Sequence, residues 1–341
     1  MKRKWTAALT VLLGAALTLT ACGGGKQQTT TGTSKDDGKT YTFKAGHSLT
    51  ENHPYHLSLK QLKENVEKRT NGKVKIEVYP LSQLGAEREL TEALSLGTAD
   101  MSISSTAPIA NFYPAIGVVD LPFLFGSREH ATKVLDGKVG QDLLKGLEKS
   151  GIIGLAWGEN GFRHITNSKK EIKSPEDLKG IKIRTQENKI HIAAFEALGA
   201  KPTPMAWTEA LTALQQGVVE AQENPAIVAD QYKLYESKQT FMSLTGHVYS
   251  PAVFMFSKSK WDTLPPDIQK IIAEEAKAAA KFEREQIAKM EEESLKKLKE
   301  KGVKIFENVD KKPFRDAIKP VYEKYESQFG KKLIEDIVNT K

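Results

Sequence analysis

Cysteine is nearly absent from the sequence, with one residue in 341, Cys22. A single cysteine excludes an intramolecular disulfide framework and leaves no second thiolate for a zinc or dithiol site. Proline is also scarce, with 14 residues, while 39% of the residues are apolar and 27% are charged. This composition excludes the disordered and collagen-like classes and is typical of a folded globular protein. At roughly 150 residues per domain, the length predicts about two domains.

A large excess of charge of one sign is lacking as well. Lys and Arg together number 50 and Asp and Glu number 43, which gives a net charge of +7. Residues 1–21 hold three of the cations and no anion, so the remaining 320 residues carry only +4. A surplus this small and scattered argues against nucleic acid as a partner.

Motifs of common enzymes are missing too. The chain has no Gly-x-Ser-x-Gly, Walker, Gly-x-Gly-x-x-Gly or His-Glu-x-x-His motif. Ser257–Lys260 and Ser294–Lys297 match the Ser-x-x-Lys of penicillin-binding enzymes, but the companion motifs are absent, which indicates coincidence. His47, His53 and His56 do not repeat on one helix face, which favours a polar loop and helix cap over a metal site. The sequence therefore offers no catalytic residue, no metal site and no cofactor site.

A long uncharged run occurs at the amino terminus. Residues 5–21 follow the basic segment Lys2–Lys4 and are short for a membrane-spanning helix. They end in Leu19-Thr20-Ala21 before Cys22, a pattern that resembles the lipobox of bacterial lipoproteins. We therefore expect residues 1–21 to be a lipoprotein signal peptide and Cys22 to be lipidated, rather than buried in a core.

Residues 22–40 contain mostly Gly, Thr, Gln and Lys without an apolar period, which predicts a flexible tether. A flexible chain of this length reaches roughly 23 Å. The expected location is therefore extracytoplasmic, with the protein lipid-anchored to the cell membrane at the cell surface or the periplasmic face.

Strand and helix patterns alternate from residue 41 onward. The expected order is strand, helix, strand, helix, strand over residues 43–46, 54–71, 74–79, 86–96 and 101–104. Strands that alternate with helices predict parallel pairing and an α/β domain.

An internal echo occurs at an offset of 120 residues. The pattern Ala-Leu-x-x-Gly followed by an acidic residue occurs at 93–100 and again at 213–220, each time as helix end, glycine cap and strand. Two similar α/β lobes facing each other would bring residues 104–106 opposite residues 222–225. Both segments follow strand carboxyl ends, where open α/β sheets bind ligands.

A long helix is expected near the carboxyl terminus. Pro265-Pro266 opens a stretch rich in Ala, Glu and Lys that ends at Gly302. About 35 residues at 1.5 Å each give roughly 50 Å, longer than one domain is wide. The apolar residues keep no strict heptad, which argues against a coiled coil and for a helix that braces two lobes.

Two arginines are candidates for anion binding. Arg163 and Arg184 lie within or at the end of the apolar-flanked segments 161–166 and 180–184. A guanidinium group matches a planar carboxylate with two parallel hydrogen bonds, which a lysine cannot do. With 43 acidic side chains in the chain, an ordinary ion pair is the alternative for each arginine, and the spacing alone leaves both open.

Eight segments carry the most specific pattern in the chain. They are Tyr79–Gly85, Leu121–Leu124, Lys173–Gly180, Arg184, Gly199–Met205, Thr208–Glu209, Ala213–Glu220 and Gln222–Pro225. They lie within residues 79–225 and resemble the solute-binding proteins of TRAP transporters, and the resemblance covers about residues 41–335.

The resemblance implies an α/β, two-lobed periplasmic-binding-protein-like fold with a hinge, an interlobe cleft and the long helix bracing both lobes. It implies capture of an organic acid and delivery to the membrane subunits of an ion-driven TRAP transporter, and hence a protein that is not an enzyme. The expected boundaries are 41–161 plus about 250–289 for lobe I and 162–249 plus about 290–341 for lobe II.

The same resemblance implies how the carboxylate is held. Arg184 matches the family's carboxylate clamp, Arg163 matches a frequent second cationic ligand, and Asn224 matches an amide that also reaches the carboxylate. A ligand-sensing lipoprotein for a membrane receptor would share these features and stays open as an alternative, as does a lipid-anchored enzyme, which would need a nucleophile or a metal.

The ligand class follows from the remaining matches. Trp207, in place of the usual Phe, is expected to form an apolar wall, and His47, Ser105 and Thr106 match the first-lobe segments that face the distal end of the ligand. A wide aromatic face with neutral hydroxyl groups opposite favours a sugar acid such as a uronate or aldonate. A four-carbon dicarboxylate is the alternative, and it would need a second cation such as a protonated His47. Sialate-binding members place charged residues where this chain has Ser105 and Pro108, so a sialic acid is not expected.

Overall fold

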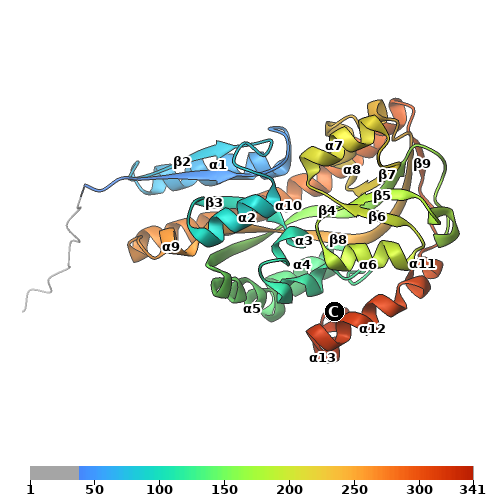
Figure 1. Cartoon of the computed structure of the whole chain (residues 1–341). Coiled ribbons are helices and arrows are strands. Elements are labelled where there is room, and N and C mark those ends of the chain that lie inside the picture. The colour runs from blue at the N-terminus through green and yellow to red at the C-terminus, as the bar shows by residue number, and fades with distance from the viewer. Residues whose placement is uncertain (1–37, 341) are drawn as a thin grey trace, which may run out of the picture. The chain divides into compact units, whose positions relative to one another are not determined.

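A mixed sheet of nine strands organises the part of the chain that the structure describes, residues 38–340 of a computed structural model. The strand order is β2-β1-β3-β8-β4-β7-β5-β6, with β9 paired to β8 (Figure 1). The strands are β1 (Tyr41–Gly46), β2 (Val74–Tyr79), β3 (Met101–Ser105), β4 (Ile152–Asn167), β5 (Lys182–Thr185), β6 (Lys201–Pro204), β7 (Ala221–Asn224), β8 (Phe241–Ser257) and β9 (Lys304–Phe306).

The amino-terminal predictions fall outside these residues. The expected signal peptide 1–21, the lipidation site Cys22 and all but the last three residues of the expected tether are not described. Within residues 38–340, no helix has both the length and the apolar character needed to span a membrane.

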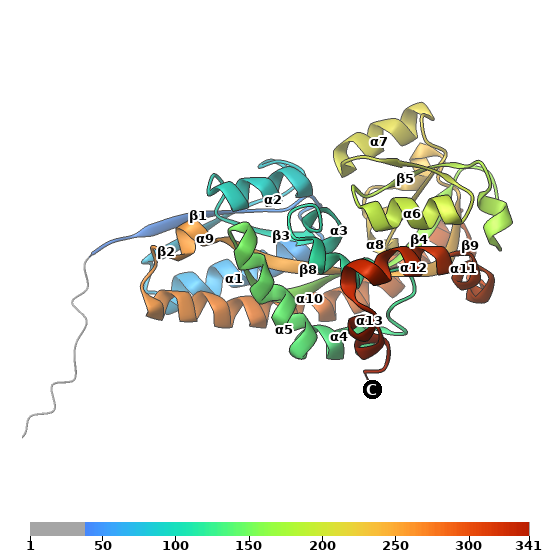
Figure 2. The same ribbon diagram turned by 60° about the horizontal axis from the view of Figure 1, so that its bottom comes forward.

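Helices cover both faces of the sheet (Figures 1 and 2). In β8 the side chains of Val253 and Met255 join one apolar core, whereas those of Phe254 and Phe256 join the other, as the alternation of a strand buried on both faces requires. The helices are α1 (Pro54–Arg69), α2 (Glu87–Leu96), α3 (Thr106–Ile109), α4 (Arg128–Asp136), α5 (Lys138–Gly146), α6 (Lys189–Ala197), α7 (Trp207–Gln216), α8 (Ala226–Gln231), α9 (Lys258–Trp261), α10 (Pro266–Glu300), α11 (Lys311–Ala317), α12 (Lys319–Phe329) and α13 (Lys331–Val338), with short 3₁₀ turns η1 (Pro114–Asp120), η2 (Leu147–Ser150), η3 (Pro175–Leu178) and η4 (Leu234–Ser237).

The predicted α/β class is confirmed, with parallel pairing in two groups of strands. β1 pairs in parallel with β2 and β3, and β5 pairs in parallel with β6 and β7. The long strands β4 and β8 were not predicted. They run antiparallel to each other and join the groups, since β8 pairs with β3 at residues 252–256 and β4 pairs with β7 at residues 164–167.

The internal echo has a structural counterpart. Helices α2 and α7 both end at a glycine in the left-handed region, Gly97 at φ 78° and Gly217 at φ 72°. Each glycine leads into a short strand, β3 or β7, and each strand into a short helix, α3 or α8. The amino-terminal residues of α2 and α7, Glu87 and Trp207, are themselves 120 positions apart and occupy equivalent places.

Helix α10 has the expected extent, 35 residues from Pro266 to Glu300. It packs along its length against α1, β4 and α8, so it contacts elements next to both groups of strands (Figure 1). Its buried face includes Ile272, Ala279 and Ile287.

The carboxyl-terminal helices contact elements from both parts of the sequence. α12 packs against α6 and η1, and the Tyr322 hydroxyl donates a hydrogen bond to the Pro122 carbonyl at 2.8 Å. In α13 the Ile337 carbonyl lies 2.8 Å from His130 Nε2 of α4. The carboxyl-terminal helices therefore contact residues before 161 as well as α6.

Candidate ligand-binding site

A small cavity, partly open to solvent and with about 30 Å³ of room for the centres of water-sized molecules, lies between two sets of chain segments. One set comes before residue 161 and the other after residue 183. The lining residues are Ser48, Leu49, Ala86, Glu87, Arg88, Pro108, Asn160, Arg184, Gln186, Glu187, Met205, Ala206, Trp207 and Asn224. The helices α2 and α7 both present their amino-terminal residues to this cavity.

Arg184 is a buried cation in the wall of the cavity. It lies in β5, one residue before the end of the strand, and its Nε and Nη2 donate to the Met205 carbonyl at 3.1 and 2.8 Å. Its guanidinium carbon lies 5.3 Å from the centre of the Trp207 ring. Among the described residues, no carboxylate lies within 4 Å of this guanidinium group. Burial lowers the pKa of Arg184 to about 10, which leaves it charged at neutral pH.

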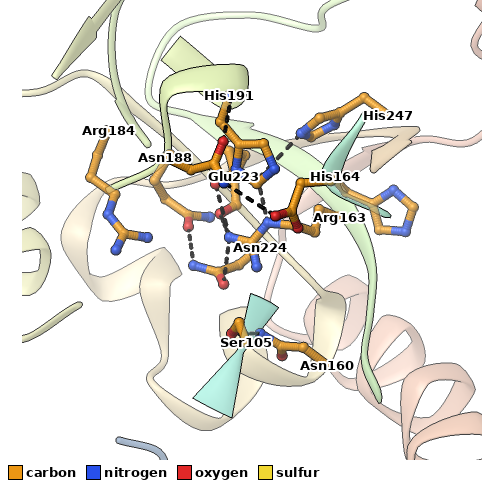
Figure 3. Close-up of polar contacts among 12 residues, drawn as sticks. Ser105, Asn160, Arg163, His164, Arg184, Asn188, His191, Glu223, Asn224 and His247 are labelled. Atoms are coloured by element: carbon orange, nitrogen blue, oxygen red, sulfur yellow. Dashed lines mark hydrogen bonds and ion pairs between the residues drawn. The ribbon is translucent and has the colours of Figure 1, made fainter. Parts of the chain in front are cut away.

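Arg163 does not line the cavity and is held differently, beside Glu223 and Asn224 (Figure 3). It is fully buried in β4, and its Nε and Nη2 both donate to the Glu223 carboxylate. Its Nη2 also donates to Asn224 Oδ1 at 3.0 Å, while Nη1 has no hydrogen-bond partner among the described residues. Arg163 therefore forms the ion pair that the sequence left open as the alternative, and it also orients Asn224.

Glu223 is the centre of this buried network. His247 Nε2 lies 3.2 Å from Glu223 Oε2, and the other His247 nitrogen lies 2.8 Å from the Thr245 hydroxyl. Burial opposes ionisation of Glu223, but the charge of Arg163 and the hydrogen bonds from Arg163 and His247 outweigh it and hold the pKa of Glu223 well below its usual range. Burial lowers the pKa of the neighbouring His191 to about 3, so this ring is neutral at physiological pH.

Asn224 and Trp207, two of the predicted ligand-binding residues, line the cavity together with Arg184. Asn224 Nδ2 donates to Gln222 Oε1 at 2.7 Å, so both ends of its amide are fixed. Trp207, the first residue of α7, packs edge-on against Tyr232 with ring centroids 5.2 Å apart. Its indole Nε1 is buried without a partner among the described residues.

The structure places His47, Ser105 and Thr106 behind the wall of the cavity rather than in it. His47 Nδ1 accepts the Leu49 amide at 3.3 Å, so Nε2 carries the proton that it donates to His56 Nδ1 at 3.1 Å. Burial and the charge of His56 lower the pKa of His47 to about 3, so it is neutral at pH 7. The Thr106 hydroxyl donates to Asp120 at 2.6 Å.

The early histidines agree with the expected loop and helix cap. His53 is the N-cap of α1, and its Nδ1 accepts the Tyr55 amide at 3.2 Å. Among residues 38–340, no cluster of three or more His, Cys, Asp or Glu side chains is arranged to bind a metal ion.

Six polar lining residues were missed by the sequence analysis: Ser48, Glu87, Arg88, Asn160, Gln186 and Glu187. Glu87 could have been found from the echo, because it stands 120 positions before Trp207. Gln186 follows Arg184 by two residues, just past the end of β5. No sequence pattern indicated Asn160. It lies in an irregularity of β4 between Glu159 and Gly161, and such a bulge changes the direction of a side chain without a recognisable sequence motif.

Comparison with known proteins identifies the family. A family model described as bacterial extracellular solute-binding protein, family 7, matches residues 45–328. A solute-binding protein of Verminephrobacter eiseniae is 43% identical over 296 residues, which cover 87% of this chain and 88% of the relative.

Solved structures agree with this match. A TRAP periplasmic solute-binding protein from Polaromonas sp. JS666, bound to D-erythronate, is 42% identical with a TM-score of 0.87 and covers 88% of this chain and 99% of its own. The sugar acid binding protein of Advenella mimigardefordensis in complex with galactonate is 37% identical with a TM-score of 0.85, and covers 88% and 97%. The chain therefore belongs to family 7 of the bacterial extracellular solute-binding proteins, the solute-binding proteins of TRAP transporters.

Proposed function

We propose that this protein captures a sugar acid, such as an aldonate or uronate, by its carboxylate and delivers it to the membrane subunits of a TRAP transporter. The observation that carries the proposal is Arg184, a buried cation in the cavity wall with no carboxylate within 4 Å among the described residues. A buried charge without a partner is costly, so an anionic ligand stabilises it. Asn224 and the Trp207 ring stand beside it.

Polar atoms around the cavity support a hydroxylated ligand. Asn160 Oδ1, Gln186 Oε1 and Trp207 Nε1 are buried without hydrogen-bond partners among the described residues, and all three residues line the cavity. An unmade buried hydrogen bond costs about 1 to 3 kcal/mol. Hydroxyl groups donate and accept, so a polyol chain satisfies this mixed set. The relatives with bound D-erythronate and galactonate carry ligands of this class.

The four-carbon dicarboxylate is less well supported. A second carboxylate needs a second cation, and His47 is buried and neutral at pH 7. The other cation of the lining, Arg88, has a side chain 51% exposed and lies 3.7 Å from Glu187.

We propose that the two sets of segments belong to two lobes, with lobe I at 41–161 plus about 250–289 and lobe II at 162–249 plus about 290–341. On one side of the cavity the Thr50 hydroxyl donates to Gln231 at 2.7 Å. On the other, Asn111 Nδ2 donates to the Glu187 carbonyl at 2.7 Å. Such contacts across the cavity favour a closed form, and a ligand that touches both sides adds to them.

The proposal includes an extracytoplasmic location with a lipid anchor at Cys22, and no role for nucleic acid. The lipobox-like end of the uncharged run supports the anchor. The family match supports transport rather than catalysis.

Replacement of Arg184 tests the proposal. We expect Arg184→Ala to weaken binding of galactonate or glucuronate by about 2 to 5 kcal/mol in titration calorimetry, because the ligand carboxylate is left buried without its partner. Lys182→Ala removes an exposed cation from the same strand and should leave affinity unchanged. If Arg184→Ala binds as tightly as the unaltered protein while retaining its melting temperature, the carboxylate lies elsewhere.

A further inference from the structure

The cavity contains a carboxylate of its own. Glu87, the first residue of α2, lines the cavity and is half-buried. Its Oε1 accepts the Ser105 amide at 2.8 Å and the Ser105 hydroxyl at 2.9 Å, and its Oε2 lies 3.1 Å from the same hydroxyl. Among the described residues, no Lys, Arg or His nitrogen lies within 4 Å of it. Burial raises the pKa of Glu87, and the hydrogen bonds from Ser105 and the charges of Arg163 and Arg184 oppose that shift.

A chain of hydrogen bonds fixes what Asn160 offers to the cavity. The Ser105 hydroxyl has one proton, and it donates this proton to Glu87. Ser105 Oγ can therefore only accept from Asn160, whose Nδ2 lies at 3.2 Å (Figure 3). The amide oxygen of Asn160 is consequently the atom left without a partner. Glu87 and Asn160 thus supply acceptors, and Ser105 positions both without lining the cavity itself.

The two sets of segments that line the cavity contribute unlike charges, Glu87 from one set and Arg184 from the other. Arg184 offers donors and positive charge, whereas Glu87 offers acceptors and negative charge. Each influences the ionisation of the other, although they are not in contact. Arg88 and Glu187 form a pair and cancel. A ligand that complements this arrangement carries an anion at one end and hydroxyl donors at the other.

We propose that Glu87 is the residue that discriminates by ligand charge: it accepts hydrogen bonds from the distal hydroxyl groups of a monocarboxylate and repels a second carboxylate at that position. The site then takes aldonates and excludes the aldarates of the same length. This inference rests on the proposed capture of a sugar acid at Arg184. It adds a repulsive element, which specific sites use as often as attraction.

Pairs of ligands that differ only in the terminal group test it. D-erythronate with meso-tartrate, and galactonate with galactarate, exchange a terminal CH₂OH for a carboxylate on an otherwise identical chain. Calorimetry would measure both pairs on the unaltered protein and on Glu87→Gln, which keeps the shape and an acceptor for Ser105. The matched control is Glu92→Gln, which removes an exposed charge from the same helix.

We expect the unaltered protein to bind at least one aldonate about 100-fold more tightly than its aldarate, since like charges brought together in an interface cost several kcal/mol. Glu87→Gln should reduce this ratio at least 10-fold, whereas Glu92→Gln should not change it. Glu87→Asp keeps the negative charge on a shorter side chain. This variant should therefore bind the aldonate more weakly but still exclude the aldarate.

The outcomes separate this inference from the proposed function. An unaltered protein that binds aldarates as tightly as aldonates, or a ratio unchanged in Glu87→Gln, overturns the role of Glu87 and leaves the Arg184 site standing. Failure of all four acids to bind overturns both.

Discussion

Two buried arginines, Arg163 and Arg184, differ in the groups that surround their positive charge. Arg163 is fully buried against the Glu223 carboxylate, whereas Arg184 has only a carbonyl group and an aromatic ring beside it. The guanidinium group of Arg163 therefore stabilises the fold, whereas that of Arg184 can still bind a ligand. The sequence placed both in the site, but the ion pair depends on Glu223, 60 residues further along the chain.

Replacement of Arg163 should lower stability first. Arg163→Ala leaves Glu223 buried without its partner, and breaking a buried pair in this way costs about 3 to 5 kcal/mol. Urea unfolding should show that loss, whereas Arg184→Ala should show a smaller one. The assignment of Arg163 to the fold is wrong if its variant unfolds like the unaltered protein and loses only ligand affinity.

Among the elements, those with local signals were predicted and those without were not. Helix α2, the glycine that ends it and strand β3 all lie within 20 residues of each other. The local sequence pattern at residues 93–100 was therefore sufficient to predict them. The strands β4 and β8 are buried on both faces, so they lack the alternation of polar and apolar residues that marks a half-buried strand. Asn160 sits in one of their irregularities, and its place in the site followed from neither period nor motif.

The two glycines that end α2 and α7 provide a comparison within one fold. Both have positive φ, so alanine at either position is strained by about 1 to 2 kcal/mol. A Cβ at Gly217 would meet no atom within 4 Å, whereas a Cβ at Gly97 would lie 2.4 Å from the Ser259 hydroxyl. Chemical unfolding should therefore show a larger loss for Gly97→Ala than for Gly217→Ala. Equal losses would mean that Ser259 moves aside at no cost.

The middle of helix α10 carries an acid that weakens the fold at high pH. Glu283 is fully buried, and its Oε2 accepts the Glu159 amide at 2.9 Å, while Oε1 has no partner among the described residues. Burial, and then the charge of Glu159, raise the pKa of Glu283 well above 4.5. The folded protein therefore retains a proton that the unfolded chain releases, and stability falls as the pH rises above about 4.5.

Glu283→Gln replaces the carboxylic acid by a neutral amide of the same shape. It should therefore remove the pH dependence of stability that Glu283 causes. We expect its free energy of unfolding to exceed that of the unaltered protein by roughly 1 to 3 kcal/mol at pH 8 and to equal it at pH 4. Urea titrations at the two pH values measure the difference. Glu285→Gln, at an exposed position of the same helix, should show neither effect.

At the scale of the whole molecule, contacts that cross the cavity set the balance between open and closed forms. Gln231 accepts from Thr50 and donates to the Asn52 carbonyl at 3.2 Å, and it does not line the cavity. Arg88 and Glu187 also join the two sets of segments, as a more exposed ion pair. Exposed pairs contribute little, whereas hydrogen bonds of this kind contribute about 1 kcal/mol each.

Gln231→Ala should therefore weaken ligand binding by about 5- to 30-fold without touching the ligand, because the closed form loses two bonds. In 0.5 M salt the screening length is about 4 Å. Under these conditions Arg88→Ala should weaken ligand binding less than Gln231→Ala does. Calorimetry on both variants decides, and a larger effect for Arg88→Ala would show that the ion pair dominates closure.

The position of β8 has a consequence for the order in which the protein is made. β8 occupies the middle of the sheet, yet β3, its neighbour, precedes it by about 150 residues. Tyr322 and Ile337 then join partners 200 and 207 residues earlier. A nascent chain lacking these segments has no complete sheet to fold around, so the sheet is completed only after nearly the whole chain has been synthesised.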